Sequence, residues 1–344
     1  MKDIRNYNLL RHNTFGIDVN CDRFVEFESQ EEVSKFFEPS AMSLRGEDDR
    51  KQPVLLLGGG SDLLLTGDYH GVVLHSAIMG RNVYSHGDDV FISVGSGENW
   101  DEIVNYCTSN GWHGLENLSY IPGEVGASAI QNIGAYGAEA KDYIHNVQAI
   151  ELSTGRQVNF SNSDCGYSYR QSKFKNEWRD KFFVTYVTYK LSRRFTPNLD
   201  YGNIRAALQE RGIEIPTAKQ LRETIISIRR NKLPEPSVEG NAGSFFMNPI
   251  VSREKYQQLA EAYPNMPHYF IDAEHEKIPA GWMIEKCGWK GKTLGRAGVY
   301  EKQALILVNK GGATGEEIVT LCRTIQHDVK EKFGIDIYPE VNIK

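Results

Sequence analysis

Three consecutive glycines, residues 58–60, stand between the apolar run 53–57 and the pair Ser61 and Asp62. Glycine lets the backbone turn sharply and lets its N–H groups approach a ligand closely. Successive N–H groups form a concave anion site that suits a pyrophosphate. A tight turn between two strands would need the same residues, so this segment alone leaves both interpretations open.

A second glycine-rich segment, residues 121–137, has small side chains without a helix or strand period. A packed core prefers larger side chains. This composition therefore favours a backbone that lies against a large flat ligand, and Gln131 and Asn132 could hydrogen-bond the edge of a heteroaromatic ring. A purely structural loop is the alternative.

A third glycine-rich turn, residues 240–246, runs into two phenylalanines. Its Ser244 could act as a nucleophile, as an acid or only as a turn residue. The Gly-x-Ser-x-Gly pattern of a hydrolase elbow is absent. Taken by itself, Ser244 is more typical of a structural serine.

The charged candidates are scattered. A lone arginine is usually a solvated surface charge, but Lys232 precedes a Leu-Pro helix stop, where a chain reversal could direct it into a cleft. Glu340 lies near the end of the chain, where carboxylates are usually exposed. The basic candidates besides Lys232 are Arg170, Arg222, Arg229 and Arg230.

The sequence does not match the common nucleotide-binding and metal-binding motifs. A P-loop needs Gly-Lys-Ser/Thr after its glycines, and no lysine follows residues 58–60. Residues 95–100 begin like a dinucleotide fingerprint, but Trp100 fills the third glycine position. The acidic stretch 272–276 lacks metal-ligand spacing, so we expect no metal site.

Composition limits the class of protein. The chain has 344 residues, enough for about two or three domains, with 40% hydrophobic and 24% charged residues. A net charge of −6 disfavours a nucleic-acid partner. No apolar run approaches the ~20 residues of a membrane helix, and the polar N-terminus lacks a signal-peptide core. Five scattered cysteines suit a reducing cytoplasm.

Hydrophobic periodicity predicts an α+β chain with a boundary near 215–235. Residues 45–51 and 111–137 lack a period and are predicted to be loops. Thr314 is expected to cap the last helix and Gly334 to end it. The expected strands are 53–57, 63–65, 72–74, 90–94, 147–152, 182–191 and 335–337, and the expected helices are 99–109, 218–231 and 315–333.

Taken together and in order, these segments resemble the UDP-N-acetylenolpyruvoylglucosamine reductase family, also called the MurB or UDP-N-acetylmuramate dehydrogenase family. The resemblance covers nearly the whole chain, and residues 121–137 and 240–246 are its most specific parts. The other matching segments are 13–16, 58–62, 114–118, 169–175, 290–291 and 339–341.

The resemblance implies a two-part FAD-binding fold of the vanillyl-alcohol-oxidase (PCMH) type, followed by a C-terminal α+β substrate-binding domain. It places the FAD-binding subdomains at 1–70 and 71–215 and the third domain at 216–344. The segment 197–202 resembles the tyrosine lid loop, near 195–205, of the longer type within the family.

The resemblance also assigns roles residue by residue. It implies that the catalytic positions are Arg170, Ser244 and Glu340. The positions implied to hold FAD are Gly58, Gly59, Gly60, Ser61, Asp62, Pro122, Gly123, Gly126, Ser128, Gln131, Asn132 and Gly134. Those implied to contact the substrate are Tyr136, Tyr201, Lys232, Asn248 and Gln303.

Two residues depart from the family pattern. Asp62 stands where most members have asparagine, and a carboxylate near a pyrophosphate is repulsive. We therefore expect Asp62 to point away or to accept hydrogen bonds from backbone N–H groups. Met247 replaces a lysine found in some members, which changes the charge beside Asn248.

The implied reaction reduces a UDP-sugar enolpyruvyl ether with NADPH through non-covalent FAD, in peptidoglycan synthesis. Hydride from flavin N5 goes to C3 of the enolpyruvyl group. Arg170 then stabilises the enolate, Glu340 assists, and Ser244 protonates C2. We expect a cytoplasmic monomer without nucleic-acid, membrane or metal partners.

Two other functions are the alternatives: an oxidase of the same superfamily and a non-catalytic nucleotide-sugar binder. Oxidases of the same superfamily with covalent flavin have a histidine after the glycine run, where this chain has Ser61. A non-catalytic nucleotide-sugar binder would have the glycine loops without the acid, the guanidinium and the carboxylate. Here all three of those positions are filled, by Ser244, Arg170 and Glu340.

Overall fold

A computed structural model describes residues 1–43 and 52–344, so the loop predicted at 45–51 lies outside the described residues. The chain forms two compact units. Unit 1 comprises Met1–Tyr7, Cys21–Gly59 and His70–Asn231, and unit 2 comprises Asn8–Asn20, Gly60–Tyr69 and Lys232–Lys344. The three-part division with boundaries at 70 and 215 stays a prediction.

Unit 1 holds almost all of a four-stranded sheet in the order β1-β2-β5-β3. The predicted strands at 53–57 and 72–74 are confirmed, because β3 pairs in parallel with β5, Leu55 opposite Val73. Their apolar residues and those of β2 are buried against helix α1, which begins after the capping side chain of Ser29. The bounds are β1 Lys2–Asn8, β2 Asn20–Phe27, β3 Val54–Leu57, β5 Tyr69–Ser76, α1 Gln30–Phe37 and α2 Pro39–Ser43.

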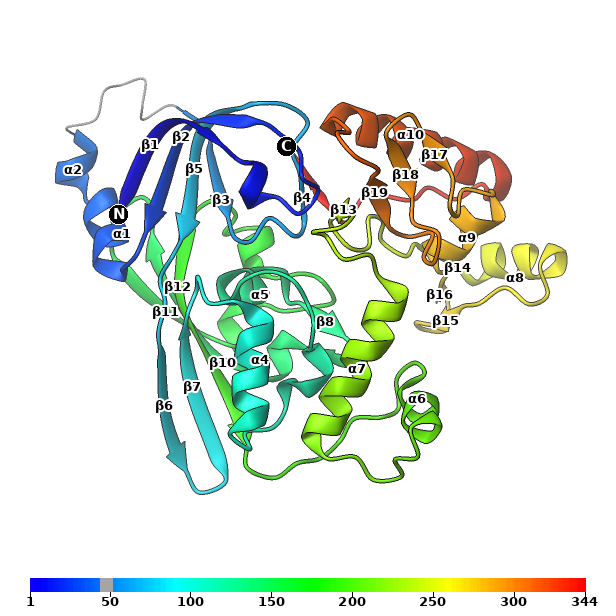
Figure 1. The fold of residues 1–344 in the computed structure, drawn as a ribbon, viewed down its shortest axis with the longest axis horizontal. Helices are drawn as coiled ribbons and strands as arrows, with labels where there is room; N and C mark the ends of the chain where they lie inside the picture. The colour runs from blue at the N-terminus through cyan, green and yellow to red at the C-terminus, as the bar shows by residue number, and fades with distance from the viewer. Residues whose placement is uncertain (44–51) are drawn as a thin grey trace. The chain divides into compact units, whose positions relative to one another are not determined.

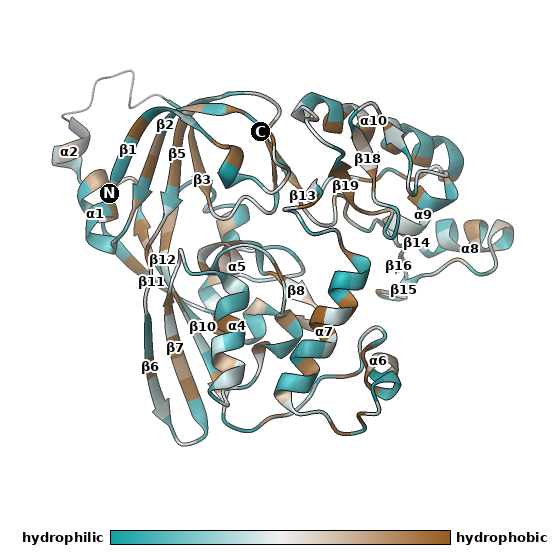
Figure 2. Cartoon of the chain, viewed as in Figure 1, coloured by the Kyte–Doolittle hydropathy of each residue, from teal (hydrophilic) through white to brown (hydrophobic). Residues whose placement is uncertain are grey.

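The larger sheet of unit 1 is antiparallel, with the order β11-β10-β12-β7-β6. Its edge strand β6 is mostly exposed and hydrophilic, whereas its neighbour β7 alternates toward the core, a contrast that Figure 2 shows. The predicted strands at 90–94, 147–152 and 182–191 are confirmed within it. The bounds are β6 Arg81–His86, β7 Asp89–Gly95, β10 Ile144–Glu151, β11 Gln157–Ser161 and β12 Phe182–Ser192.

Helices α4 and α5 cover one face of this sheet, and α7 runs beside them (Figure 1). The predicted helix at 99–109 is confirmed as α4, with the side chain of Asn99 capping its first turn. The predicted helix at 218–231 is confirmed as α7, which ends just before Pro234. The bounds are α4 Trp100–Ser109, α5 Val125–Gln131, α6 Ile204–Glu210, α7 Ala218–Lys232, β8 Gly134–Ala135 and β9 Ala138–Glu139.

Unit 2 contains two small antiparallel sheets, ordered β13-β19-β18-β17 and β14-β16-β15, and a parallel pair of β4 and β20. Helix α10 is confirmed as predicted: Thr314 and Glu317 form a capping box, and Gly334 ends it in a left-handed conformation. The bounds are β4 Leu63–Leu64, β13 Gly240–Asn241, β14 Ile250–Ser252, β15 Tyr269–Phe270, β16 His275–Lys277, β17 Thr293–Leu294, β18 Ala297–Val299, β19 Leu307–Asn309, β20 Asn342–Ile343, α8 Arg253–Ala262, α9 Ala280–Lys286 and α10 Gly315–Phe333.

Two predictions about elements are wrong. The segment 111–137 is not only loop, because it contains α5 and short 3-10 turns at Leu115–Leu118. The terminal strand is β20 at 342–343 rather than 335–337. Ile335 and Ile337 are buried and alternate like a strand, but the carbonyl of Ile337 accepts a hydrogen bond from the Gln326 side chain instead of a strand partner. Among the described residues, no helix is long and apolar enough to cross a membrane.

Candidate active site

In unit 1, the first two glycines of the run 58–60 lie against the second glycine-rich segment. A Cβ added to Gly58 would be 3.3 Å from the Cβ of Ala127, and one added to Gly59 would be 3.1 Å from the Cα of Gly123. The two glycines are therefore tightly packed: Gly58 faces the side chains of Ala127 and, at 3.4 Å, Glu124, and Gly59 faces the backbone of Gly123. A glycine cradle of this kind can bring backbone N–H groups close to the pyrophosphate of a dinucleotide, because the glycines themselves carry no side chains.

The small residues of α5 have a packing role as well. A Cβ added to Gly126 would lie 2.8 Å from the Cβ of Ser96, in the turn that follows β7. Two backbone bonds fix this approach, from the N–H of Gly126 to Ser96 and from the N–H of Val125 to Glu98. The hydroxyl of Ser128 is buried and bonds Val125 and Tyr189. The small side chains therefore let α5 sit directly on the sheet.

Two polar side chains that were predicted to face the flavin are engaged within the protein. The fully buried Asn132 donates to Glu139 at 2.7 Å and to the carbonyl of Ser168 at 2.9 Å, and its oxygen accepts from Lys141. Gln131 accepts from the ammonium of Lys175 at 2.8 Å. The flavin roles of Asn132 and Gln131 stay predictions.

Arg170 lies in a tight turn that is held in place by the segment predicted to face the flavin. Ser168 and Gln171 bond each other's backbones across the turn, and Arg170 itself has a left-handed φ of 56°. Its guanidinium donates to the carbonyl of Gly134 at 2.9 Å. The hydroxyl of Ser172 donates to Ile130 at 2.6 Å. The structure thus joins the predicted catalytic arginine to the segment predicted to hold the cofactor.

Strained backbone gathers in this part of unit 1. Six non-glycine residues have positive φ among those that the structure describes. Four of them, Tyr120, Asn132, Tyr136 and Arg170, lie within or beside the segments that form the candidate site. Conformations of this kind cost free energy and persist where surrounding contacts enforce them, often at functional sites.

Arg229, which is not among the predicted site residues, interacts with two of them, Arg170 and Tyr136. Burial lowers the pKa of its guanidinium, Tyr136 opposes this shift, and the positive charge of Arg170 adds to it. Tyr136 shares a hydrogen bond with Arg229 and interacts with Tyr201. The positive charges of Arg170 and Arg229 therefore act on each other, and positive charge of this kind suits an anionic group such as a carboxylate or a phosphate.

The segment carrying Tyr201 packs against the same tyrosine turn. A Cβ added to Gly137 would be 3.1 Å from the Cβ of Tyr201. The side chain of Asn117 ties the two segments, because it donates to the carbonyls of Tyr136 and Asn198. The side chain of Tyr201 is about half exposed, at 52%.

In unit 2, the last glycine of the run meets the third glycine-rich turn through Thr14. Gly60 has a left-handed φ of 62°, and a Cβ there would be 2.1 Å from the carbonyl oxygen of His12. Thr14 donates from its backbone to Gly60 and from its hydroxyl to Asn241 at 2.6 Å. The glycine at position 60 is therefore required by both conformation and space.

Ser244 and Glu340 come together on neighbouring extended segments of unit 2. The N–H of Glu340 donates to the carbonyl of Phe245 at 2.8 Å, and Phe246 pairs with Pro339. Gly243, with a φ of 69°, turns the chain just before Ser244, whose side chain is exposed. Buried Phe245 and Phe246 anchor the segment. The backbone pairing thus places Glu340 opposite Phe245, the residue that follows Ser244.

Two of the predicted substrate residues lie beside the start of α9. The side-chain oxygen of Asn248 accepts from the N–H of Ala280 at 2.9 Å. The side-chain oxygen of Gln303 is 3.1 Å from the position that a Cβ on Gly281 would take. Lys232 is exposed at the end of α7, and Met247 is exposed beside Asn248.

The carboxylate of Asp62 accepts a hydrogen bond, as expected from its departure from the family pattern, but from a side chain. Asn342 donates to its Oδ2 at 3.0 Å, and the backbone carbonyl of Asp62 also accepts from Asn342. Within the described residues, no three His, Cys, Asp or Glu side chains form a group that could hold a metal ion. In the acidic stretch 272–276, His275 pairs with Asp272 and Glu276 with His268.

Comparison with known families follows the same division of the sequence. An FAD-binding domain model matches residues 22–161, and the model of the UDP-N-acetylenolpyruvoylglucosamine reductase C-terminal domain matches residues 235–344. With the glycine cradle at 58–59, these matches define an FAD-dependent oxidoreductase.

Close relatives extend over the whole chain. UDP-N-acetylenolpyruvoylglucosamine reductase of Bacteroides fragilis is 51% identical over 338 residues, and that of Porphyromonas gingivalis is 43% identical over 341, each covering 98% of both chains. The chain belongs to the UDP-N-acetylenolpyruvoylglucosamine reductase family, whose members act in peptidoglycan synthesis. The predicted family is confirmed.

The fold prediction is confirmed too. The crystal structure of UDP-N-acetylenolpyruvylglucosamine reductase from Thermus caldophilus superimposes with a TM-score of 0.66 and covers 99% of this chain and 98% of its own, at 20% identity. The two-part FAD-binding fold with a C-terminal α+β domain therefore describes this chain.

Proposed function

We propose that the chain reduces the enolpyruvyl ether of UDP-N-acetylglucosamine to UDP-N-acetylmuramate, with NADPH as the reductant. The observation that carries the proposal is the turn at Arg170, whose guanidinium donates to the carbonyl of Gly134 in the segment predicted to hold the cofactor. When bound, FAD supplies hydride transfer, from NADPH to C3 of the enolpyruvyl group by way of N5.

Arg170 stabilises the negative charge that develops when C3 receives hydride. That charge spreads from C2 into the carboxylate, and a guanidinium is always charged and matches a carboxylate with two parallel N–H groups. The strained turn supports this role, because it fixes the arginine before the substrate arrives. Arg229 adds a second positive charge at the same place.

Ser244 delivers the proton to C2. A hydroxyl is a weak acid, but the carbon of an enolate is a strong base, so a well-positioned hydroxyl is sufficient. Glu340 orients this system from the neighbouring segment, to which it is joined through Phe245. Lys232, Asn248 and Gln303 bind the nucleotide sugar.

Tyr201 covers the substrate as the lid residue of the longer type in the family. Its half-exposed ring and its position beside Tyr136 and Gly137 support this role. The five cysteines carry free thiols, which supports action in the cytoplasm. We propose that the enzyme acts as a monomer.

The test is a steady-state assay with the purified protein. We expect oxidation of NADPH only when the enolpyruvyl UDP-sugar is present, with one UDP-N-acetylmuramate formed per NADPH and slower turnover with NADH. Oxidation of NADPH at the same rate with oxygen alone would contradict the proposal and indicate an oxidase.

A second assay examines how FAD is held. The cradle at Gly58, Gly59, Pro122 and Gly123 binds FAD without a covalent link, because Ser61 stands where covalent oxidases have histidine. Denaturation should therefore release all yellow colour into the filtrate. Colour that stays with the precipitated chain would show a covalent flavin.

A further inference from the structure

Tyr120 has an unusual conformation immediately before the cofactor segment. Its φ is 59°, in the left-handed region that disfavours residues with a Cβ. The next three residues, 121–123, lead into the turn that meets Gly59. The direction in which the chain leaves Tyr120 therefore sets where Pro122 and Gly123 lie.

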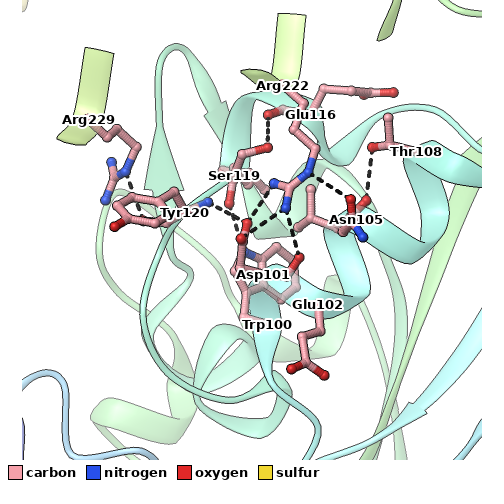
Figure 3. A network of polar contacts seen from close by, with 12 residues as sticks. Trp100, Asp101, Glu102, Asn105, Thr108, Glu116, Ser119, Tyr120, Arg222 and Arg229 are labelled. Atoms are coloured by element: carbon pink, nitrogen blue, oxygen red, sulfur yellow. Dashed lines mark hydrogen bonds and ion pairs between the residues drawn. The ribbon is translucent and has the colours of Figure 1, made fainter. Parts of the chain in front are cut away.

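Contacts on both sides hold the backbone of Tyr120 in this conformation. Its N–H donates to the Oδ1 of Asp101 at 2.5 Å, and its carbonyl accepts from the Nε of Arg229 at 3.0 Å. The guanidinium of Arg230 lies over its ring, 5.0 Å from the centroid. Figure 3 shows Asp101 reaching the amide from α4 while Arg229 approaches from α7.

Asp101 is in turn held by Arg222 of α7. The two guanidinium nitrogens of Arg222 donate to both carboxylate oxygens, at 2.7 and 2.9 Å. Arg222 is buried, with only 8% of its surface exposed. A bidentate, charge-assisted pair of this kind fixes the carboxylate in one orientation.

The same end of α4 also holds both flanks of the segment. The indole N–H of Trp100 donates to the carbonyl of Leu118 at 2.8 Å, and the backbone N–H of Trp100 donates to the carbonyl of Gly123 at 3.0 Å. Residues 118–123 are therefore attached to α4 at three points. The middle attachment, at Tyr120, is the strained one, and it uses a carboxylate that Arg222 orients.

We propose that Arg222 is a positioning residue for the cofactor segment: through Asp101 it holds Tyr120 in the left-handed conformation and so places residues 121–123 for FAD. This inference rests on the proposed function, because it takes that segment as the one that faces FAD. Arg222 touches neither cofactor nor substrate in this account. A purely structural alternative is that the ion pair only ties α7 to α4.

The experiment measures the FAD dissociation constant of the full chain, after the flavin has been removed, in three backgrounds at position 120. In the wild-type background, Arg222→Met should raise the constant about tenfold, because a left-handed residue costs roughly the 1.4 kcal/mol that corresponds to a factor of ten. Glycine adopts this conformation without strain. In the Tyr120→Gly background, Arg222→Met should therefore raise the constant less than about twofold.

Tyr120→Ala is the matched background, since it removes the same ring but keeps the strain. There Arg222→Met should again cost about tenfold. Equal effects in the glycine and alanine backgrounds would overturn the proposal and leave a role only in helix packing, as would no effect in the wild-type background. Where Arg222→Met does not fold, Arg222→Lys keeps the charge but loses the bidentate pairing, and the same dependence on background is required.

Arg211→Met is the control for general loosening of α7. Arg211 bonds Thr224 and Glu223 of α7 but belongs to the segment after α6. It should lower the melting temperature without changing the FAD dissociation constant. A wild-type chain that binds no FAD would contradict the proposed function itself, whereas a wild-type chain that binds FAD with no effect of Arg222→Met would contradict only this inference.

Discussion

Arg170 and Ser244 are held in different ways, and the difference matches the roles proposed for them. Arg170 sits in a left-handed turn with its guanidinium bonded to Gly134, so its charge is fixed in advance. Ser244 is exposed after the turn at Gly243, and buried Phe245 anchors the next position. A fixed charge lowers the barrier without reorganisation, whereas a proton donor needs only to reach one carbon atom.

Ser244→Ala should separate the two half-reactions. Reduction of the flavin by NADPH should proceed at the wild-type rate, because the hydroxyl takes no part in it. Reoxidation by the enolpyruvyl substrate should slow by about 10²–10⁴-fold, the range for loss of a positioned acid. Stopped-flow absorbance of the flavin measures both steps.

Ser237→Ala is the matched control, because Ser237 is another exposed serine of unit 2. It should leave both half-reactions unchanged. Normal reoxidation in the Ser244→Ala variant would rule out Ser244 as the proton donor.

Gly126→Ala should weaken FAD binding and lower stability. The added Cβ would come 2.8 Å from the Cβ of Ser96, so α5 must move off the sheet. Overpacking of this kind costs about 1–3 kcal/mol. Gly67→Ala is the control, since a Cβ there would meet nothing within 4 Å. Thermal unfolding with and without FAD measures both effects, and equal melting temperatures for the two variants would contradict the packing role.

Candidate site residues could be named from the sequence, but the directions in which their side chains point could not be predicted. Asn132 and Gln131 were expected to face a ring, yet Asn132 is bonded inside the chain, and only the fold decides which way an amide points. Nothing in its residue type distinguishes Arg229 from an arginine on the surface. Its place three residues before Lys232, on the last turn of α7, was the available signal.

At the scale of elements, the sequence predicts long periodic segments well and short ones poorly. Helix α10 has an apolar stripe, a capping box and a terminal glycine, and all three features indicate the same helix. Helix α5 has Gly, Ala and Ser where a stripe would be, because close approach to Ser96 excludes large side chains. Because the close packing requires small residues, the segment lacks the hydrophobic periodicity that would predict a helix.

A buried charge network joins the four-stranded sheet to the start of α5. The two ring nitrogens of His75 on β5 contact Glu26 at 3.0 Å and Glu124 at 3.1 Å. Burial alone would lower the pKa of His75, but its hydrogen bonds and the charges of Glu124 and Glu26 raise it. Glu124 lies beside Gly58, so the network also supports the first glycine turn.

The stability of the fold should therefore depend on pH through His75. Because the pKa of His75 is raised on folding, its contribution is fully present below the ordinary histidine value of about 6.5 and is lost as pH rises through the folded value. Burial alone would raise the pKa of Glu26, but Lys2 and His75 lower it, so that contribution is lost in acid.

His75→Gln should remove the alkaline fall in stability and lower the free energy of unfolding by about 1–3 kcal/mol near pH 6, since buried carboxylates lose a charged partner. Urea unfolding at a series of pH values measures this. His70→Gln on the same strand is the control, because His70 is exposed and pairs only weakly with Asp22, at 3.3 Å. An unchanged pH profile in His75→Gln would contradict the coupling.

At the scale of the whole molecule, the family resemblance predicted more than the periodicity did. Periodicity gave an α+β chain with a boundary near 215–235, whereas the glycine segments taken in order indicated the FAD-binding fold and the C-terminal domain. A relative that matches 98% of the chain confirms the predicted family. Local patterns cannot specify such a fold, because it depends on contacts between segments far apart, such as Gly58 with Ala127.

The most direct measurement of the central claim is a single turnover in the absence of oxygen. The protein is reduced with one equivalent of NADPH and then mixed with the enolpyruvyl UDP-sugar. We predict that the oxidised flavin spectrum returns and that one UDP-N-acetylmuramate forms per flavin. A flavin that stays reduced until oxygen is admitted would contradict the account.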